Sequence, residues 1–295
     1  SEQKDASANQ IKKEIYSSGI NATFFELAQE HLDDLESTEK LNRLSTDKAW
    51  LSFIIKYHNS KQLSFQEIDE RFLKKLMLTL KVKYSLSETS IMNILVFVRL
   101  LFNRAIKYKI VSRELYPFGG DKIKIKFPET TKVGLNILEI QQIENLINLK
   151  PSEIHTRNVW LFSFNFAGMR VSDVLRTKWS DIYDNRLHYR MHKNAKLLSL
   201  KIPEKVLKIL DQYKDDKRSD DDFVFPELKK ADPENAKDLY NKRKTATKRF
   251  NDNLKSISKK AKINKKITMH IARHSFGNIA GDAIHPLMLQ KLYRH

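Results

Sequence analysis

The scarcity of glycine is the feature that most constrains how this chain folds. Only seven glycines occur in 295 residues, and three of them lie in one short stretch, YPFGGDKIKIKFPETTKVGL, together with two prolines. Such clustering is typical of a linker between two compact parts, because glycine and proline favour loops over regular elements. We therefore predict two domains, separated by a linker at 116–135 and preceded by a polar segment at 1–19.

The residues before the linker, 20–115, have a helical pattern. Ser87 has the side chain of an N-cap, and after it apolar residues recur at three- and four-residue spacing, as Ile91, Leu95, Val98, Leu101, Phe102 and Ala105. Further helices are predicted at FFELAQEHLDDLE, around Leu44 to Tyr57, and at EIDERFLKKLMLTL. The first domain is therefore predicted to be a small helical bundle.

The residues after the linker, 136–295, mix helices with a short stretch of β pattern. Asn136 and Glu139 have the spacing of a capping box and predict a helix through Ile147, and Val159 to Phe166 predicts another. In RLHYRMHKNAKLLSLKIP two β-compatible runs flank a turn at Lys193-Asn194-Ala195, and Pro203 is expected in the first turn of the next helix. The fold class predicted is mainly α with a small β-hairpin sheet (α+β).

The charge of the chain favours a polyanionic partner. There are 54 Lys and Arg against 36 Asp and Glu, a formal net charge of +18, and the segment from Lys229 to Lys266 has 14 basic and 4 acidic residues in 38 positions. The absence of cysteine excludes disulfides, thiolate metal sites and cysteine nucleophiles. No apolar run is long enough to cross a bilayer and the start of the chain is polar, so we expect a cytoplasmic protein without membrane contact.

The segment Gly168-Met169-Arg170-Val171-Ser172-Asp173 is the first candidate site. A glycine permits a tight turn before a new helix, and an arginine at a helix start lies where free amides already favour an anion. Arg170 is therefore a candidate phosphate ligand. The alternative is a surface arginine paired with Asp173.

The segment Thr268-Met269-His270-Ile271-Ala272-Arg273-His274-Ser275 is the second candidate site. If Thr268 caps a helix, His270 and Arg273 share one face and offer several hydrogen-bond donors to one anion. His274 lies four residues after His270, which also permits a zinc site, but the glutamate of the HExxH pattern is missing. Another alternative is that His274 is simply a hydrogen-bonded helix or core histidine. A third segment, LQKLYRH, ends in His295 and means little by itself.

In this order, the segments resemble the tyrosine recombinase (phage integrase) family over about residues 20 to 295. FAGMRVSDVLRTKWSDI resembles the first arginine motif of that family, HIARHS resembles its His-x-x-Arg motif, and LQKLYRH resembles its Leu-Gly-His segment. MHKN lies where the family has its catalytic lysine. The helical first half resembles the SAM-like core-binding domain of mobile-element integrases, Bacteroides-type ones especially, and 136–295 resembles the catalytic domain.

The resemblance implies a role for each candidate residue. Arg170 and Arg273 would bind the non-bridging oxygens of the scissile phosphate, with Asp173 supporting Arg170. His270 would assist as a donor or acid/base, and His295 would donate to the same phosphate. Lys193 would protonate the leaving 5′-hydroxyl, although Lys196 lies in the same turn and is the alternative. No metal or cofactor is expected, because fixed cations would stabilise the pentacoordinate phosphorus.

The resemblance has two departures. Tyr293-Arg294 stands where the family has Leu-Gly, and the nucleophilic tyrosine of the family, expected a short way beyond the final histidine, is not matched by any of the ten tyrosines. We therefore interpret the sequence as truncated before that tyrosine and expect residues 1–295 to bind DNA without cleaving it. The longer protein would form a 3′-phosphotyrosyl intermediate.

The expected partners are double-stranded DNA, three further copies of the chain in a synaptic tetramer, and DNA-bending or excision factors. Candidate DNA contacts are basic residues on predicted outer helix faces, namely Arg99, Arg104, Lys107, Lys242, Arg243, Lys248 and Arg249. One alternative is a helical DNA-binding or regulatory protein without chemistry. The other is a metal-dependent nuclease that uses His270, His274 and His295.

Overall fold

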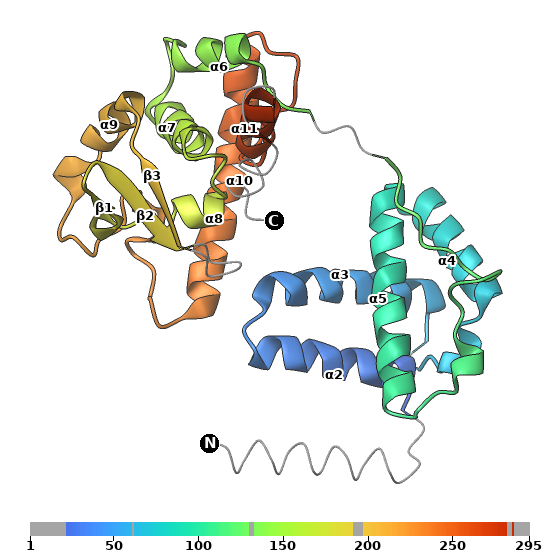
Figure 1. Cartoon of the computed structure of the whole chain (residues 1–295). Helices are drawn as coiled ribbons and strands as arrows, with labels where there is room; N and C mark the ends of the chain where they lie inside the picture. The colour runs from blue at the N-terminus through green and yellow to red at the C-terminus, as the bar shows by residue number, and fades with distance from the viewer. Residues whose placement is uncertain (1–21, 61, 130–132, 191–196, 282–284, 286–295) are drawn as a thin grey trace. The chain divides into compact units, whose positions relative to one another are not determined.

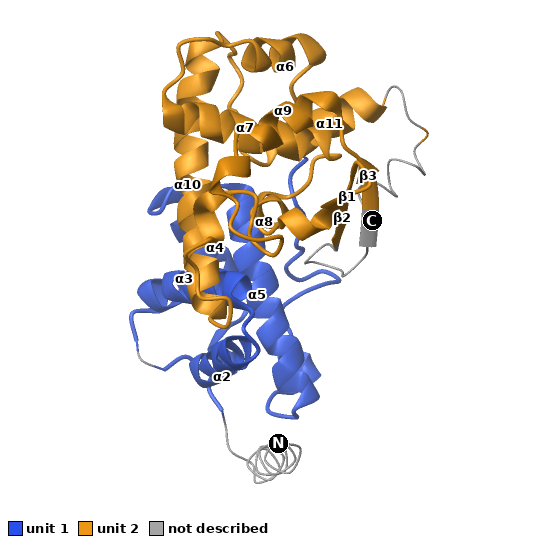
Figure 2. Cartoon of the chain, turned by 90° about the vertical axis from the view of Figure 1, so that its left-hand side faces the viewer, with its two compact units in different colours: residues 1–130 blue, residues 131–295 orange. Residues whose placement is uncertain are grey.

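The computed structural model describes residues 22–60, 62–129, 133–190, 197–281 and 285. Contacts divide the chain into two compact units, Ser1–Thr130 and Thr131–His295, which Figure 2 colours separately. Each unit encloses its own cluster of buried apolar side chains. The polar segment predicted at 1–19 lies outside the described residues.

Unit 1 is built from helices, as predicted. Side chains cap three of them: Thr23 forms a capping box with Glu26, Asp69 accepts from the amide of Phe72, and Ser87 accepts from the amide of Ser90. The long helices, labelled in Figure 1, are α2 (Phe24–Ser37), α3 (Leu41–His58), α4 (Glu70–Val82) and α5 (Glu88–Lys107).

Helix α5 forms the centre of the core of unit 1. The stripe predicted from Ile91 to Ala105 is buried on this helix, which confirms the periodicity. Ile94 and Phe97 are also fully buried, so that the apolar face is wider than predicted. By length and composition α5 could cross a membrane, but buried core helices pass the same test and half of its apolar window is buried here.

The linker prediction at 116–135 was wrong for its first half. Phe118 and Ile123 are buried in the core of unit 1, and the amide of Gly119 donates to the carbonyl of Ile123 at 3.0 Å. Gly119 and Gly120 both have positive φ, and they reverse the chain so that these apolar side chains return to the bundle. The glycine pair therefore marks a turn within unit 1.

Unit 2 is organised around helix α7, whose Trp160 and Phe162 are fully buried. Helices α6, α8, α9, α10 and α11 all contact it. Figure 1 shows these elements in chain order from green to red. Their bounds are α6 Ile137–Glu144, α7 Pro151–Asn165, α8 Val171–Val174, α9 Glu204–Asp211, α10 Ala236–Lys260 and α11 Ile271–Gly281.

Unit 2 also contains the small antiparallel sheet that was predicted. It has the order β1 (Ile182–Tyr183), β2 (Arg186–Arg190) and β3 (Leu197–Lys201), and Leu187 pairs with both Ile182 and Leu200. Leu187 is fully buried, which fixes the register because a shift by one residue would expose it. The predicted turn with Lys193 lies outside the described residues.

Helices α6 and α9 have boundaries that differ from the prediction, and α7 begins at Pro151, before the predicted Val159. Helix α6 has the predicted capping box at Asn136 but ends at Glu144, before Ile147. Arg157 of α7 donates to the carbonyls of Glu144 and Leu146, which satisfies acceptors that a longer helix would have used. Pro203 is the residue before α9, in extended backbone, and not part of its first turn.

Candidate active site

The turn between α7 and α8 presents the first candidate residue, Arg170. Ala167 and Gly168 both have positive φ, at 55° and 66°, and they turn the chain sharply after α7. The turn is held by Ser163, whose Oγ donates to the carbonyl of Met169 at 2.6 Å. Arg170 follows in extended backbone as the N-cap residue of α8. The helix start predicted from the sequence is present, although α8 has only four residues.

Gly168 brings this turn into contact with α11. A Cβ atom at position 168 would lie 2.5 Å from the Cα of Arg273, so that only glycine permits the approach. Arg273 is buried, and its Nη1 donates to the carbonyl of Gly168 at 3.1 Å. The two arginine segments identified in the sequence are therefore neighbours in unit 2.

His270 lies on the turn just before α11, which begins at Ile271. Two helices hold this turn: Trp160 of α7 donates to the carbonyl of Thr268 at 3.1 Å, and Asn251 of α10 accepts from the amide of Met269 at 2.9 Å. His270 itself is exposed, and its ring meets that of His274 edge-on with 4.6 Å between centroids. A side chain that can reach a ligand is thus carried on a fixed backbone.

The guanidinium group of Arg170 has no partner among the described residues. Its Nη1 is buried without a hydrogen bond, and across the described parts of the chain no ion pair or side-chain hydrogen bond of Arg170 is found. Asp173 is buried in α8, and no ion pair between it and Arg170, which the surface alternative required, is found among the described residues. A half-buried cation without a counterion favours a bound anion, because an uncompensated buried charge is unfavourable.

Two further residues, Ser275 and Gly134, join α11 to the segment before α6. The sequence patterns did not indicate either of them. Ser275 is fully buried, and its Oγ accepts from the amide of Leu135 at 2.8 Å and donates to the carbonyl of Ile271. Gly134 packs so closely that a Cβ there would lie 2.5 Å from the side chain of Asn278. Ser275 adjoins the His-x-x-Arg segment, but nothing in the sequence indicated its partner 140 residues away.

Several basic residues that were predicted to contact DNA have partners within the protein. Arg104 donates to Glu30 at 2.9 Å and to Asp34 at 2.5 Å, and Arg249 donates to Glu227 at 2.7 Å. Lys242 pairs with Asp238 at 2.8 Å. Lys107 and Lys248 are exposed, and Arg99 is half-buried. Arg243 is half-buried, with its guanidinium over the ring of Tyr240.

The two remaining candidates, Lys193 and His295, lie outside the described residues, as does Lys196. Among the side chains that are described, no three of His, Asp and Glu lie close enough to share a metal ion.

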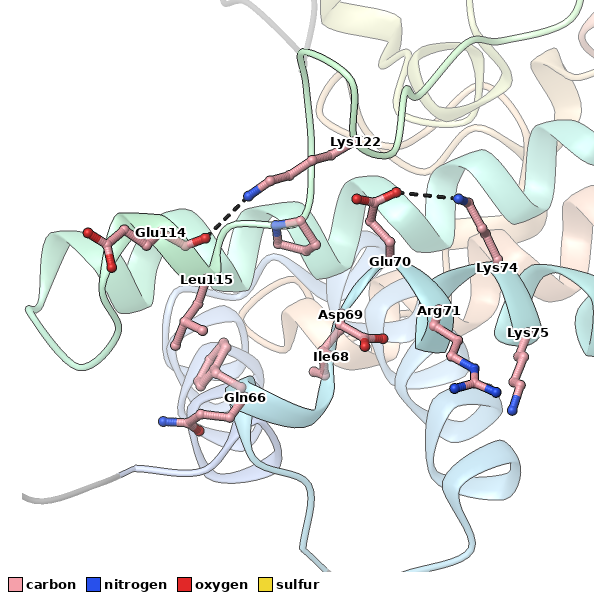
Figure 3. A pocket seen from close by; sticks show the side chains of 12 residues that line it. Gln66, Ile68, Asp69, Glu70, Arg71, Lys74, Lys75, Glu114, Leu115 and Lys122 are labelled. Carbon is pink, nitrogen blue, oxygen red and sulfur yellow. Dashed lines mark hydrogen bonds and ion pairs between the residues drawn. The ribbon is translucent and has the colours of Figure 1, made fainter.

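A separate hollow of about 620 Å³ lies in unit 1 (Figure 3), between the start of α4 and the segment from Glu114 to Lys122. Lys122 reaches across to the carbonyl of Glu114, and Glu70 pairs with Lys74 at 3.4 Å. Acidic and basic side chains are mixed around it, unlike the uncompensated cation at Arg170.

Comparison with known proteins agrees with this architecture. The family model described as "Phage integrase family" matches residues 135–295, which is more than half of the chain, and the model described as "Phage integrase SAM-like domain" matches 23–125. No curated protein matches the chain.

Solved structures share the fold at low sequence identity. A lambda integrase fragment, in a dimer bound to a COC' core site, has a TM-score of 0.65 and 15% identity, and the match covers 93% of this chain and 95% of that one. Lambda integrase in a tetramer bound to a Holliday junction has a TM-score of 0.64, 16% identity and coverage of 96% and 80%. The Tn1549 transposon integrase with transposon right-end DNA has a TM-score of 0.63, 15% identity and coverage of 93% and 91%. With its two arginine segments in contact and both family models matched in order, the chain belongs to the phage integrase family.

Proposed function

We propose that this protein is a tyrosine-type site-specific recombinase, which cuts and rejoins duplex DNA to integrate or excise a mobile element. The observation that carries the proposal is the half-buried guanidinium of Arg170, which has no partner among the described residues, beside the turn at Gly168 that Arg273 holds. Family membership supports the reaction class.

The arrangement suits a transesterification at phosphorus. Negative charge develops on the non-bridging oxygens as the pentacoordinate state forms, and guanidinium groups held in place before the reaction stabilise it. Arg170 and Arg273 are the proposed phosphate ligands, since arginine binds phosphate through two parallel hydrogen bonds and stays charged. The hydrogen bond to Gly168 uses one nitrogen of Arg273, and the exposed His270 would donate to the same phosphate.

Lys193 and His295 complete the proposed site on the strength of the resemblance alone. Lys193 would protonate the leaving 5′-hydroxyl, and His295 would donate to the phosphate. Asp173, buried in α8, would support the backbone that presents Arg170. A tyrosine beyond His295 would be the nucleophile, and the phosphotyrosyl bond would conserve the energy for rejoining.

The proposed partner is double-stranded DNA in the cytoplasm, bound as a tetramer in synapsis. The net charge of +18 favours binding through phosphates, so affinity should fall steeply with salt. The similar structures include DNA complexes of lambda and Tn1549 integrases, one of them a lambda tetramer. DNA-bending or excision factors would add directionality.

A nicked suicide substrate tests the chemistry, using the natural full-length protein. The wild type should form a covalent protein–DNA adduct that chelators do not prevent. Arg170→Ala should abolish the adduct while most duplex binding remains, and Arg218→Ala, a change at an exposed arginine of the same unit, should leave both unchanged.

Each rival function has its own outcome in this experiment. DNA binding without any wild-type adduct would identify a non-catalytic DNA-binding protein. Cleavage that is lost on chelation and leaves no adduct would identify a metal-dependent nuclease. An adduct that survives Arg170→Ala would disprove the assignment of Arg170.

A further inference from the structure

In the part of the chain that the structure describes, four arginines have a buried guanidinium nitrogen without a hydrogen-bond partner: Arg104, Arg157, Arg170 and Arg176. In Arg104 and Arg157 another nitrogen of the same group donates to the protein, to Glu30 and Asp34 in one and to the carbonyls of Glu144 and Leu146 in the other. Arg170 and Arg176 have no such compensating side-chain contact within the described ranges. Arg176 therefore shares the property that identifies Arg170 as an anion ligand, yet neither the sequence patterns nor the comparisons assign it a role.

The backbone around Arg176 is fixed. Its amide donates to the carbonyl of Asp173 at 3.1 Å, and the next residue, Thr177, is buried. Thr177 donates from Oγ1 to the same carbonyl at 3.2 Å, and its own carbonyl accepts from the amide of Val224 at 2.9 Å. The backbone that carries the half-buried guanidinium is thus held in place.

Charges of both signs act on Arg176. Burial lowers the pKa of Arg176 first of all, and the positive charge of Arg243 on α10 lowers it further, whereas Asp173 acts in the opposite direction. Because burial outweighs the favourable charge of Asp173, a bound anion would stabilise the half-buried guanidinium. α10 also carries most of the basic segment from Lys229 to Lys266.

We propose that Arg176 binds a second backbone phosphate of the DNA, separate from the phosphate at Arg170 and Arg273. Arg170 and Arg176 flank the short helix α8, so one rigid segment would hold two phosphates of the duplex. Arg176 would therefore set the position of the duplex on unit 2 without touching the reacting atoms. This inference rests on the proposed DNA-binding function.

The test replaces the charge by an apolar side chain of similar length. Arg176→Met in the full-length protein should leave the melting temperature of the DNA-free protein unchanged or raised, because it removes an uncompensated charge. The same variant should weaken duplex binding about tenfold. The slope of log K against log salt should fall by about one, as for the loss of one phosphate contact.

Arg157→Met is the matched control. Arg157 is also a half-buried arginine of unit 2, but its Nη1 has two carbonyl acceptors. The control should lower the melting temperature and leave the salt slope unchanged. If Arg176→Met behaves in the same way as this control, Arg176 is a structural residue and the inference is wrong.

Two other outcomes separate the possible failures. If the wild type shows no salt-dependent duplex binding, the proposed function itself fails. If the wild type binds, and Arg170→Ala lowers the salt slope but Arg176→Met does not, only the second phosphate site is disproved. A loss of self-association without DNA in Arg176→Met would also overturn it, because the partner of Arg176 would then be a carboxylate of another copy.

Discussion

Arg273 donates a hydrogen bond from Nη1 to the backbone carbonyl of Gly168 at 3.1 Å, across 105 residues of sequence. The contact joins the helix that follows His270 to the turn that presents Arg170. It uses a backbone acceptor, so no carboxylate neutralises Arg273 through this bond. The bond thereby orients the guanidinium of Arg273 relative to this turn.

Gly168→Ala should disrupt this contact. The new Cβ would lie 2.5 Å from the Cα of Arg273, in a backbone with φ of 66°, so that α11 must shift. We expect a loss of about 1–3 kcal/mol in the free energy of unfolding and loss of the covalent adduct. Urea unfolding and the suicide-substrate assay measure the two effects.

Gly281→Ala is the control for that change. Gly281 lies at the end of the same helix, and nothing lies within 4 Å of a Cβ built there. This variant should keep its stability and its adduct. Equal behaviour of the two variants would show that the close approach at Gly168 is unimportant.

Ser275→Ala should weaken the anchoring of α11 to the segment that enters unit 2. It leaves the buried amide of Leu135 without its acceptor, which we expect to lower the free energy of unfolding by about 1–3 kcal/mol. Adduct formation should decrease, since α11 carries Arg273. Ser219→Ala, at an exposed serine of unit 2, should change neither quantity, and an unchanged Ser275→Ala would contradict the anchoring role.

Glu153 should contribute to the acid sensitivity of unit 2. Burial raises the pKa of this carboxyl, but hydrogen bonds from Lys260, Ser256 and the amide of Lys150, with the charge of Lys260, outweigh burial and lower the pKa to about 2. A carboxyl with a lowered folded-state pKa stabilises the fold above its ordinary value of 4.5, and the stabilisation is lost as pH falls from there towards 2.

Glu153→Gln tests this pH dependence. In urea unfolding at a series of pH values, the variant should be less stable than the wild type at neutral pH and lose less stability over the acid range. Glu234→Gln, at an exposed position, should follow the wild type. If the free energy of unfolding of Glu153→Gln changes with pH in parallel with that of the wild type, Glu153 does not contribute to the acid sensitivity.

Arg104→Met should destabilise unit 1 and leave the salt dependence of DNA binding unchanged. Its guanidinium binds Glu30 and Asp34, and removing it leaves two carboxylates together without their cation. We expect a loss of about 1–3 kcal/mol in the free energy of unfolding. If the slope of log K against log salt falls in this variant, Arg104 contacts DNA after all.

Lys107→Met provides the matched comparison from the same helix. Lys107 is exposed, so the change should preserve stability. Its effect on the salt slope tests the DNA contact that the sequence predicts there. Comparison of Arg104→Met with Lys107→Met thus distinguishes a cation paired with carboxylates of the protein from a cation exposed to solvent.

Most helices of both units could be predicted from the sequence alone. The apolar stripe of α5, the cap at Ser87 and the capping box at Asn136 are local patterns, and helix hydrogen bonds join residues close in sequence, so these patterns indicate helices before any tertiary contact is known. The order of the motifs was likewise enough to identify the family, because it does not depend on distances in space.

Tertiary structure alone decided which segments meet and which charges remain available. Packing of α7 against α10 and α11 brings Gly168 to Arg273 and Ser275 to Leu135, and no local pattern encodes contacts across more than a hundred residues. Whether an arginine is neutralised also depends on residues from other helices. The sequence therefore showed where cations occur, while burial and partners distinguish Arg104, which is paired, from Arg170 and Arg176, which have no hydrogen-bonded side-chain partner among the described residues.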